Sequence, residues 1–135
     1  MTTQSLCQKR VFVVDDNPAN MFVMSSLLKK AGAETSYERW GTTTLQRMRA
    51  FAPIDLVLMD LMFPGTSGYE LFDLIHAEPD FADIPIVAVS AGDPASALPK
   101  VQAKGFVAFI AKPIDYDHFD QQILKILNNE AVWVF

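Results

Sequence analysis

Cysteine is nearly absent from this chain, and so are the long apolar runs of membrane proteins. Cys7 is the only cysteine among 135 residues, so no disulfide can form within the chain, and a reducing compartment is expected. No apolar run approaches the ~20 residues that a membrane-spanning helix needs. The N-terminus also lacks the charged and long apolar segments of a secretory signal. We therefore expect a cytoplasmic, soluble domain that does not bind a membrane.

An excess of positive charge is lacking as well. The net charge is −5, with 11 lysines and arginines against 16 aspartates and glutamates. Because binding to a phosphate backbone depends on clustered basic residues, we expect no nucleic acid partner. Acids gathered in one pocket would favour a cation instead. Half of the residues are hydrophobic and a fifth are charged, which is typical of a globular chain, and the length favours a single domain.

One stretch, residues 55–68, organises the rest of the chain. It reads DLVLMDLMFPGTSG: an apolar run that stops at the carboxylate of Asp60 and is followed by turn-forming residues. A short apolar run bounded by glycine and proline is typical of a strand buried on both faces. Asp60 then lies at the carboxyl end of that strand, which is where open α/β sheets hold their ligands.

The remaining chain alternates between strand-like and helix-like patterns. Apolar runs typical of buried strands occupy residues 9–16, 84–89 and 106–111, and a mixed-polar run at 34–37 suits an edge strand. Apolar residues at helical spacing predict helices over residues 17–31, 41–53, 69–78 and 116–127. Strands separated by helices imply right-handed crossovers, so we predict a parallel sheet with helices on both faces.

The segment between Ser90 and Gly105 fits this pattern least well. Pro94 could begin a helix, but Pro99 would then lie inside it and remove a backbone hydrogen bond. We therefore expect a short fourth helix that begins near Pro99, with a mobile loop before it.

Polar side chains follow four of the five predicted strands. Asp15 and Asp16, Asp60, Ser90 and Lys112 each come at a strand's carboxyl end, and in a parallel sheet these ends lie along one edge. Three carboxylates held close together repel one another, and oxygen ligands of this kind favour a hard cation such as Mg²⁺. The ammonium and the hydroxyl suit phosphate oxygens. The group predicts phosphoryl transfer onto an aspartate.

These residues carry a resemblance to a known family. The motifs VFVVDD, LVLMDLMFPGTSG, VAVSA and AKP stand in the order and at the separations of the receiver domain of two-component response regulators. The resemblance covers nearly the whole chain. It implies a flavodoxin-like, doubly wound, five-stranded parallel sheet in the order 2-1-3-4-5. It also implies a receiver domain over residues 1–129, which leaves residues 130–135 as an apolar C-terminal tail.

The resemblance also assigns roles to individual residues, all at the predicted edge. Asp60 would be the phosphoacceptor, and Asp15, Asp16, Asp60 and the Met62 carbonyl would hold Mg²⁺, which Mn²⁺ could replace. Lys112 would contact the acyl phosphate, and Ser90 would move toward it after phosphorylation. Phe109 stands at the position of a switching aromatic residue, and the peptide bond between Lys112 and Pro113 is a candidate for the cis form. The phosphoryl group would come from the histidine of a kinase or of a histidine phosphotransfer protein.

Each residue also has a plainer explanation. Asp15 and Asp16 could cap the following helix, Ser90 could be a solvated strand end, and Phe109 taken alone is better explained as core. Two positions depart from the commoner forms of the family: Met62 follows the acceptor by two residues, and Gly92 follows Ser90 by two. Neither side chain can hold an attacking water by a hydrogen bond, so we predict slow self-dephosphorylation.

The tail EAVWVF is unusually apolar after two asparagines. An exposed tail of this kind would be adhesive. We expect it to fold back onto the domain, with pairing to a partner or to a second copy as the alternative.

The predicted function is that of a stand-alone response regulator, a monomer or weak homodimer that is not itself an enzyme. Without a second domain, its output would be either relay of the phosphate or binding of a downstream protein. A non-phosphorylated scaffold of the same fold is the first alternative. A Mg²⁺-dependent phosphohydrolase and a flavodoxin-like electron carrier are weaker alternatives, because the sequence offers neither a general acid or base nor a glycine-rich phosphate loop.

Overall fold

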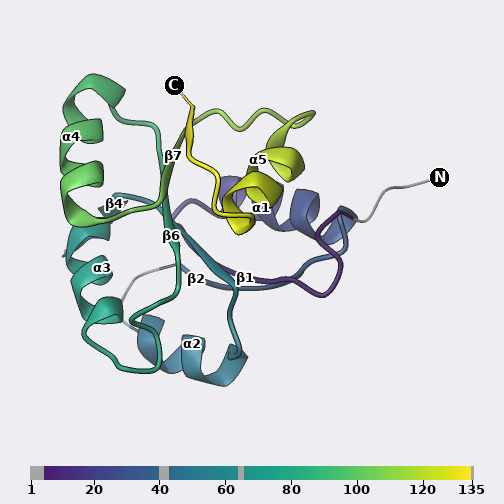
Figure 1. The fold of residues 1–135 in the computed structure, drawn as a ribbon, viewed down its shortest axis with the longest axis horizontal. Helices are drawn as coiled ribbons and strands as arrows, with labels where there is room; N and C mark the ends of the chain where they lie inside the picture. The colour runs from purple at the N-terminus through teal and green to yellow at the C-terminus, as the bar shows by residue number, and fades with distance from the viewer. Residues whose placement is uncertain (1–4, 40–42, 64–65, 135) are drawn as a thin grey trace.

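The computed structural model describes residues 5–39, 43–63 and 66–134 of the chain (Figure 1). Its helices are α1 (Pro18–Lys30), α2 (Thr44–Phe51), α3 (Gly68–His76), α4 (Pro94–Lys104) and α5 (Phe119–Leu127). Its strands are β1 (Arg10–Val14), β2 (Glu34–Glu38), β3 (Leu56–Met59), β4 (Met62–Phe63), β5 (Thr66–Ser67), β6 (Ile86–Ser90), β7 (Ala108–Ala111) and β8 (Val132–Val134). The predicted start of the second helix, Gly41, lies outside the described residues.

Six of these strands form one sheet in the order β2-β1-β3-β6-β7-β8, and every neighbouring pair is parallel. β4 and β5 form a separate antiparallel pair directly after β3. The parallel sheet arises because each strand is followed by a helix that returns the chain to the same end of the sheet. The carboxyl ends of β1, β3, β6 and β7 therefore share one edge.

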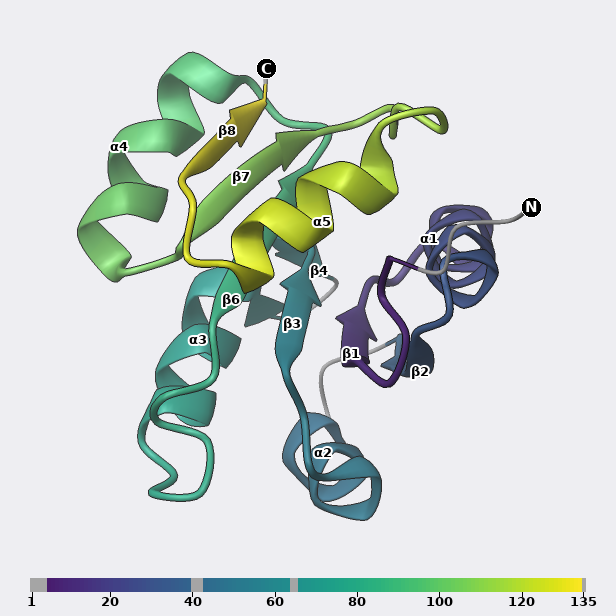
Figure 2. The same cartoon turned by 45° about the vertical axis from the view of Figure 1, so that its right-hand side comes forward.

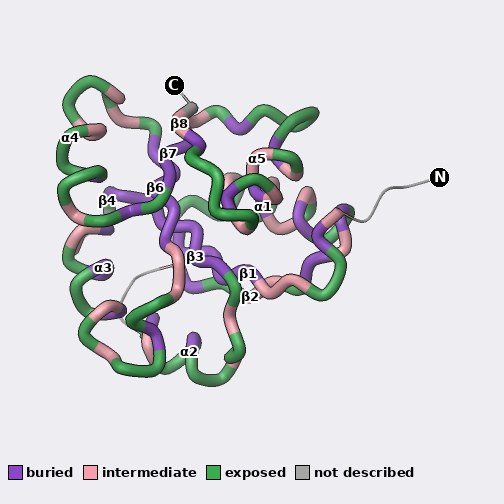
Figure 3. Tube along the Cα trace, viewed as in Figure 1, coloured by how far each residue is buried: buried purple, intermediate pink, exposed green. Residues whose placement is uncertain are grey.

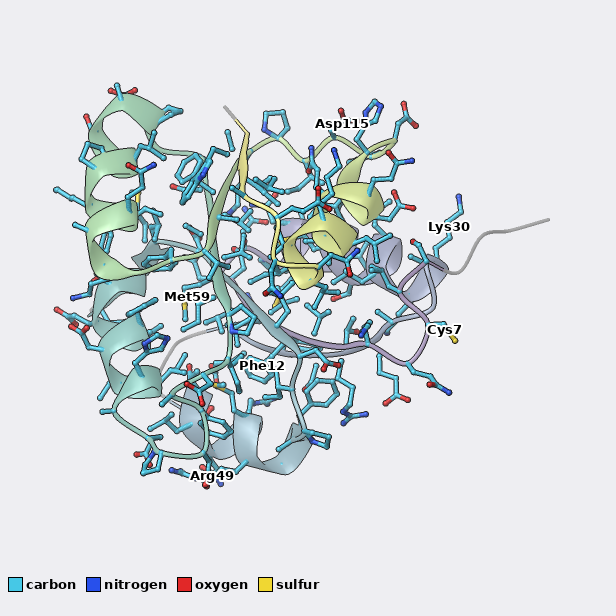
Figure 4. All side chains as sticks on the ribbon, viewed as in Figure 1. Cys7, Phe12, Lys30, Arg49, Met59 and Asp115 are labelled. Atoms are coloured by element: carbon cyan, nitrogen blue, oxygen red, sulfur yellow. The ribbon has the colours of Figure 1, made fainter. Side chains whose placement is uncertain are left out.

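Helices cover both faces of the sheet, as the alternation of strands and helices predicts. α1 and α5 pack on one face, where Met24 and Ile123 lie in one apolar cluster with Val11 and Leu58 of the sheet. α2, α3 and α4 pack on the other, where Phe12 and Met59, both labelled in Figure 4, belong to the second cluster. Figure 3 shows the resulting pattern, with buried strands between helices whose outer sides are exposed.

The start of α1 shows how local sequence sets an element's bounds. Asn17 has extended backbone angles and its side chain accepts a hydrogen bond from the Asn20 amide, while Pro18 occupies the first helical turn. The cap satisfies an amide that the helix itself cannot, and proline loses nothing at this position. Gly32 follows the helix with a φ of 99°, a left-handed conformation that glycine adopts without strain.

The prediction of five strands in the sheet is wrong. The first five strands in the chain that enter the main sheet do follow the predicted 2-1-3-4-5 order, but the apolar tail supplies a sixth, β8, which pairs with β7. Figure 2 shows β8 beside β7, at the end of the sheet away from β2. The tail folds back because its valine and tryptophan can bury apolar surface there while their backbone groups pair with β7.

The expected late start of the fourth helix is also wrong. α4 begins at Pro94 and continues through Pro99 to Lys104. Three features stabilise it. The Asp93 side chain accepts a hydrogen bond from the Ala95 amide, Val101 is fully buried, and Gly105 ends the helix in a left-handed conformation. Together these offset the backbone hydrogen bond that a proline removes from a helix interior.

No helix in the described part of the chain combines the length and the apolar character needed to span a membrane.

The cost of Pro99 can be measured because its side chain is exposed and packs little. We expect Pro99→Ala to raise the free energy of unfolding by about 1–3 kcal/mol, since alanine restores the missing amide donor without changing the core. Denaturant unfolding monitored by circular dichroism measures this value. Pro94→Ala is the matched control, because proline fits the first turn; it should change stability by less than about 0.5 kcal/mol. Equal effects of the two substitutions would contradict this account of α4.

Candidate functional site

The residues at the carboxyl ends of the strands come together at one edge of the sheet. Carboxylate oxygens of Asp15, Asp16 and Asp60 all lie within 4.8 Å of one another. Asp15 is fully buried, and Asp60 is 7% exposed. These two acids follow β1 and β3, which are neighbours in the sheet, so the parallel topology brings them together although they are far apart in the chain.

Backbone hydrogen bonds beyond the strands fix this edge in place. The Asp60 amide donates to the Val14 carbonyl at 2.8 Å, and the Asp15 amide donates to the Glu38 carbonyl at 3.2 Å. On the other side, the Lys112 amide donates to the Ser90 carbonyl at 2.9 Å. The positions of these residues therefore follow from the rigid sheet rather than from a flexible loop.

Lys112 lies between two of the acids. Its Nζ is 2.8 Å from an Asp15 carboxylate oxygen and 3.5 Å from an Asp60 oxygen, and its side chain is 9% exposed. The peptide bond between Lys112 and Pro113 is cis. One ammonium thus faces two carboxylates of a group of three, which leaves the site with a net negative charge and favours an additional cation.

Burial gives Asp60 an unusual titration. Together, its surroundings raise the pKa of Asp60 to about 6: removal of the carboxylate from water raises it, Lys112 lowers it, Asp15 raises it, and the amides of Met62 and Leu61 lower it. The desolvation of the charged form is the largest of these effects. A perturbed carboxylate at a sheet edge with specific charged neighbours is typical of a functional site.

The segment after Asp60 approaches its backbone very closely. The Met62 amide lies 3.4 Å from an Asp60 carboxylate oxygen, and the Met62 side chain is 66% exposed. Gly68, the first residue of α3, leaves no room for a side chain, because a Cβ there would lie 2.3 Å from the Asp60 carbonyl oxygen. The sequence marked Gly68 only as a turn former. Its position could have indicated this contact: Gly68 comes eight residues after the strand-end Asp60 and directly before the helix predicted over residues 69–78.

Ser90 is buried at the end of β6, with 1% of its surface exposed. Its hydroxyl oxygen accepts a hydrogen bond from the Gly92 amide at 3.1 Å. A Cβ on Gly92 would lie 3.3 Å from that oxygen, so a larger residue would crowd it. The hydroxyl thus belongs to the same edge, where this local bond holds it.

Phe109 lies on β7, paired with Ala88 of β6, and is fully buried in the apolar cluster that faces α2, α3 and α4. This position suits both explanations that the sequence left open, since a core residue and a switching residue would each be buried here.

The chain belongs to the family of response regulator receiver domains, whose family model matches residues 11–124. It is 32% identical to the polar-differentiation response regulator DivK of Brucella ovis over 121 residues, which are 90% of this chain and 98% of DivK. It is 34% identical to the CAI-1 autoinducer sensor kinase/phosphatase CqsS of Vibrio cholerae over 128 residues, or 94% of this chain. The chain spans only 18% of the length of CqsS.

Solved structures share the fold at lower identity. The chemotaxis protein CheY4 of Vibrio cholerae superposes with a TM-score of 0.81 at 19% identity, with 89% of this chain and 99% of CheY4 covered. The receiver domain of the sensor histidine kinase PA1611 from Pseudomonas aeruginosa was solved with a magnesium ion coordinated in the active site cleft. It gives a TM-score of 0.77 at 24% identity, with 90% of this chain and 98% of the PA1611 chain covered. The predicted flavodoxin-like fold of two-component receivers is therefore confirmed.

The raised pKa of Asp60 has a consequence for stability. The folded protein binds the proton of the Asp60 carboxyl group more tightly than the unfolded chain does, where the pKa is 3.8. Ionisation of Asp60 therefore lowers the free energy of unfolding as the pH rises from about 4 to 6. We expect Asp60→Asn to raise the free energy of unfolding at pH 7.5 in EDTA by about 1–2 kcal/mol. The gain should shrink as the pH falls through this interval and disappear by about pH 3, where Asp60 is protonated in both states.

Denaturant unfolding across this pH range measures the effect. Asp73→Asn is the control, because Asp73 forms an exposed ion pair with Lys104; it should change stability by less than about 0.5 kcal/mol at every pH. A stability gain from Asp60→Asn that is the same at pH 4 and pH 7.5 would contradict the assignment to ionisation.

Proposed function

We propose that this protein accepts a phosphoryl group on Asp60 from the histidine of a partner, either a histidine kinase or a histidine phosphotransfer protein. The observation that carries the proposal is the meeting of three carboxylates with Lys112 at one edge of the sheet. Membership of the receiver family and the similarity to DivK and to the kinase CqsS support it.

The acidic group fits Mg²⁺, with Mn²⁺ able to replace it. Three carboxylate oxygens within 4.8 Å of one another need only small side-chain movements to converge on a common ion at the ~2.1 Å that Mg²⁺ requires, and oxygen ligands suit it. Asp15, Asp16 and Asp60 would hold the ion, with the Met62 carbonyl as a further ligand by family resemblance. When bound, the ion neutralises negative charge on the carboxylates and on the incoming phosphoryl oxygens. The magnesium ion in the PA1611 receiver supports this assignment.

In the transfer itself, the Asp60 carboxylate is the nucleophile. One of its oxygens forms the new bond to phosphorus while the bond between phosphorus and the partner's imidazole nitrogen breaks, and the electron pair of that bond stays on the nitrogen. Lys112, already 3.5 Å from Asp60, would stabilise charge on the phosphoryl oxygens. The Ser90 hydroxyl would leave the Gly92 amide and donate to one of these oxygens.

The output would follow from a shift between two conformations that involve Ser90 and Phe109. The protein would either relay the phosphate onward or bind a downstream protein through the altered surface. We place it in the cytoplasm as a monomer or weak homodimer.

A non-phosphorylated scaffold of the same fold is the rival function. Nothing in a scaffold requires three carboxylates to be held together at a cost in repulsion, so the intact acidic group favours the phosphorylated regulator.

Phosphorylation can be tested with acetyl phosphate and Mg²⁺, followed by intact mass spectrometry. We expect the wild-type protein to gain the mass of one phosphoryl group, and Asp60→Asn to gain none. Lys112→Ala should react about 100-fold more slowly, as expected from the loss of one preorganised charge. Asp73→Asn, which changes an exposed aspartate of α3 that pairs with Lys104, is the matched control and should react like the wild type.

EDTA should suppress the reaction of the wild type. A wild-type protein that gains no phosphoryl group, or an Asp60→Asn variant that gains one, would overturn the proposal. Release of more than one equivalent of phosphate from a stable phosphate ester would favour a hydrolase instead.

The exposed thioether of Met62 and the absent side chain of Gly92 also predict a long-lived phosphoprotein. Hydrolysis needs a positioned water, and neither residue can hold one. We expect Met62→Asn to shorten the half-life about tenfold, because its amide can hydrogen-bond that water. Release of inorganic phosphate after removal of the donor measures the half-life. Leu74→Asn, at another exposed apolar position, is the control; a wild-type half-life of seconds would contradict the prediction.

A further inference from the structure

The sixth strand changes the surroundings of Phe109. In the register of β7 and β8, Ala108 pairs with Val132, and Phe109 pairs with Trp133. β7, which would otherwise be the edge of the sheet, therefore lies between β6 and β8 (Figure 2). The strand belongs to no part of the predicted phosphorylation site, so its role has to be argued from its contacts.

β8 packs on both faces of the sheet. Val132 is 7% exposed and lies in the cluster that faces α1 and α5. Trp133 is partly buried against the opposite cluster, which contains Phe109. Paired residues on neighbouring strands point to the same face. Trp133 therefore lies beside Phe109, on the side away from β6.

Ser90 lies on the other side of Phe109. Ala88 of β6 pairs with Phe109, and Ser90 pairs with Ala111. Residues two apart on a strand share a face, so Ser90 and Phe109 point to the same side of the sheet, one diagonal step apart. A row of side chains thus runs across the sheet, from Ser90 on β6 through Phe109 on β7 to Trp133 on β8.

Close packing couples the members of such a row. If Ser90 moves toward a phosphoryl group on Asp60, it vacates volume beside Phe109, and protein interiors leave little volume empty. With Trp133 in place, the outer side of Phe109 is covered, so the ring is held toward β6, where it fills that volume. Removal of Trp133 would take away packing on that side of Phe109, so the ring would be held less firmly toward β6 and would fill the vacated space less well.

We propose, on the basis of the proposed function, that Trp133 is a positioning residue for Phe109 and that β8 and the phosphorylation site stabilise each other. Docking of β8 favours the conformation in which Asp60 is phosphorylated. Reciprocally, phosphorylation tightens the docking of β8, because the coupling between two sites is the same in both directions.

The first test measures binding of beryllofluoride, which mimics a phosphoryl group on aspartate, to the full chain in Mg²⁺ by fluorine NMR titration. We expect Trp133→Ala to weaken binding about fivefold, and Trp133→Phe to restore most of the affinity, since a flat ring can still cover Phe109. In a Phe109→Leu background, Trp133→Ala should have little further effect. A merely structural role of Trp133 would change the melting temperature but not this pattern.

Ile126→Val is the matched control for a general loss of stability. Ile126 is a buried residue of α5 in the other cluster, so its truncation should lower the melting temperature and leave the beryllofluoride affinity unchanged. Equal affinities of the wild type and Trp133→Ala would overturn the inference and leave the proposed function standing. A wild-type protein that binds no beryllofluoride would overturn the proposed function itself.

The second test needs no variant and so does not depend on the folding of Trp133→Ala. Hydrogen exchange of wild-type amides, followed by mass spectrometry, reports the opening of β8. We expect β8 to exchange at least threefold more slowly with beryllofluoride and Mg²⁺ than with Mg²⁺ alone. Unchanged or faster exchange of β8, with beryllofluoride bound, would overturn the inference.

Discussion

The main physical constraint on this protein is the repulsion of like charges that a rigid sheet holds together at one edge. Asp15, Asp16 and Asp60 lie together, Asp15 and Asp60 are fixed by backbone hydrogen bonds that extend the strands, and the ammonium of Lys112 faces these two acids. Such an arrangement is unfavourable on its own account. It persists because the sheet and its two apolar clusters supply the stability that the site itself lacks.

This constraint explains the chemistry that we assign to the site. A carboxylate that is both buried and surrounded by charge gains from anything that spreads or neutralises that charge, whether a cation or a proton. Burial raises the pKa of Asp60 to about 6, so the group retains its charge near neutral pH at a cost in stability. Binding of a divalent ion together with a phosphoryl group would replace the repulsion among the carboxylates by attraction to the ion.

Much of this arrangement was predictable from the sequence, because it follows from strand ends. Apolar runs that stop at Asp15, Asp60, Ser90 and Lys112 mark where strands end, and parallel topology alone then brings the ends together. The closer approach of the Lys112 Nζ to Asp15, at 2.8 Å, than to Asp60, at 3.5 Å, was not predictable, because the ends of strands fix the backbone and not the conformation of a long side chain. The contact of Gly68 with the Asp60 backbone depends on the path of a hairpin, which composition does not determine.

The two errors of the sequence analysis have a common physical cause. Pro99 favoured a late start of the fourth helix, and the tail was expected to fold back but not to join the sheet; yet α4 continues through the proline and residues 132–134 form a sixth strand. In both places tertiary burial outweighs local preference: Val101 of α4 is buried against the sheet, and Val132 of β8 is buried beside β7. A propensity argument treats each segment by itself and cannot include the apolar surface that another segment provides.

β8 also changes where this protein can present a signal. A receiver sheet of five strands would expose the outer edge of β7 to partners, whereas here the backbone groups along that edge are already paired with β8. A partner that adds a strand to the sheet must therefore pair with the outer side of β8 or displace it. The same strand borders Phe109 through Trp133, so a movement of the Phe109 ring would reach the outer edge of β8 through the proposed contact with Trp133. One row of side chains thus runs from the edge of the sheet to Ser90, beside the proposed phosphorylation site.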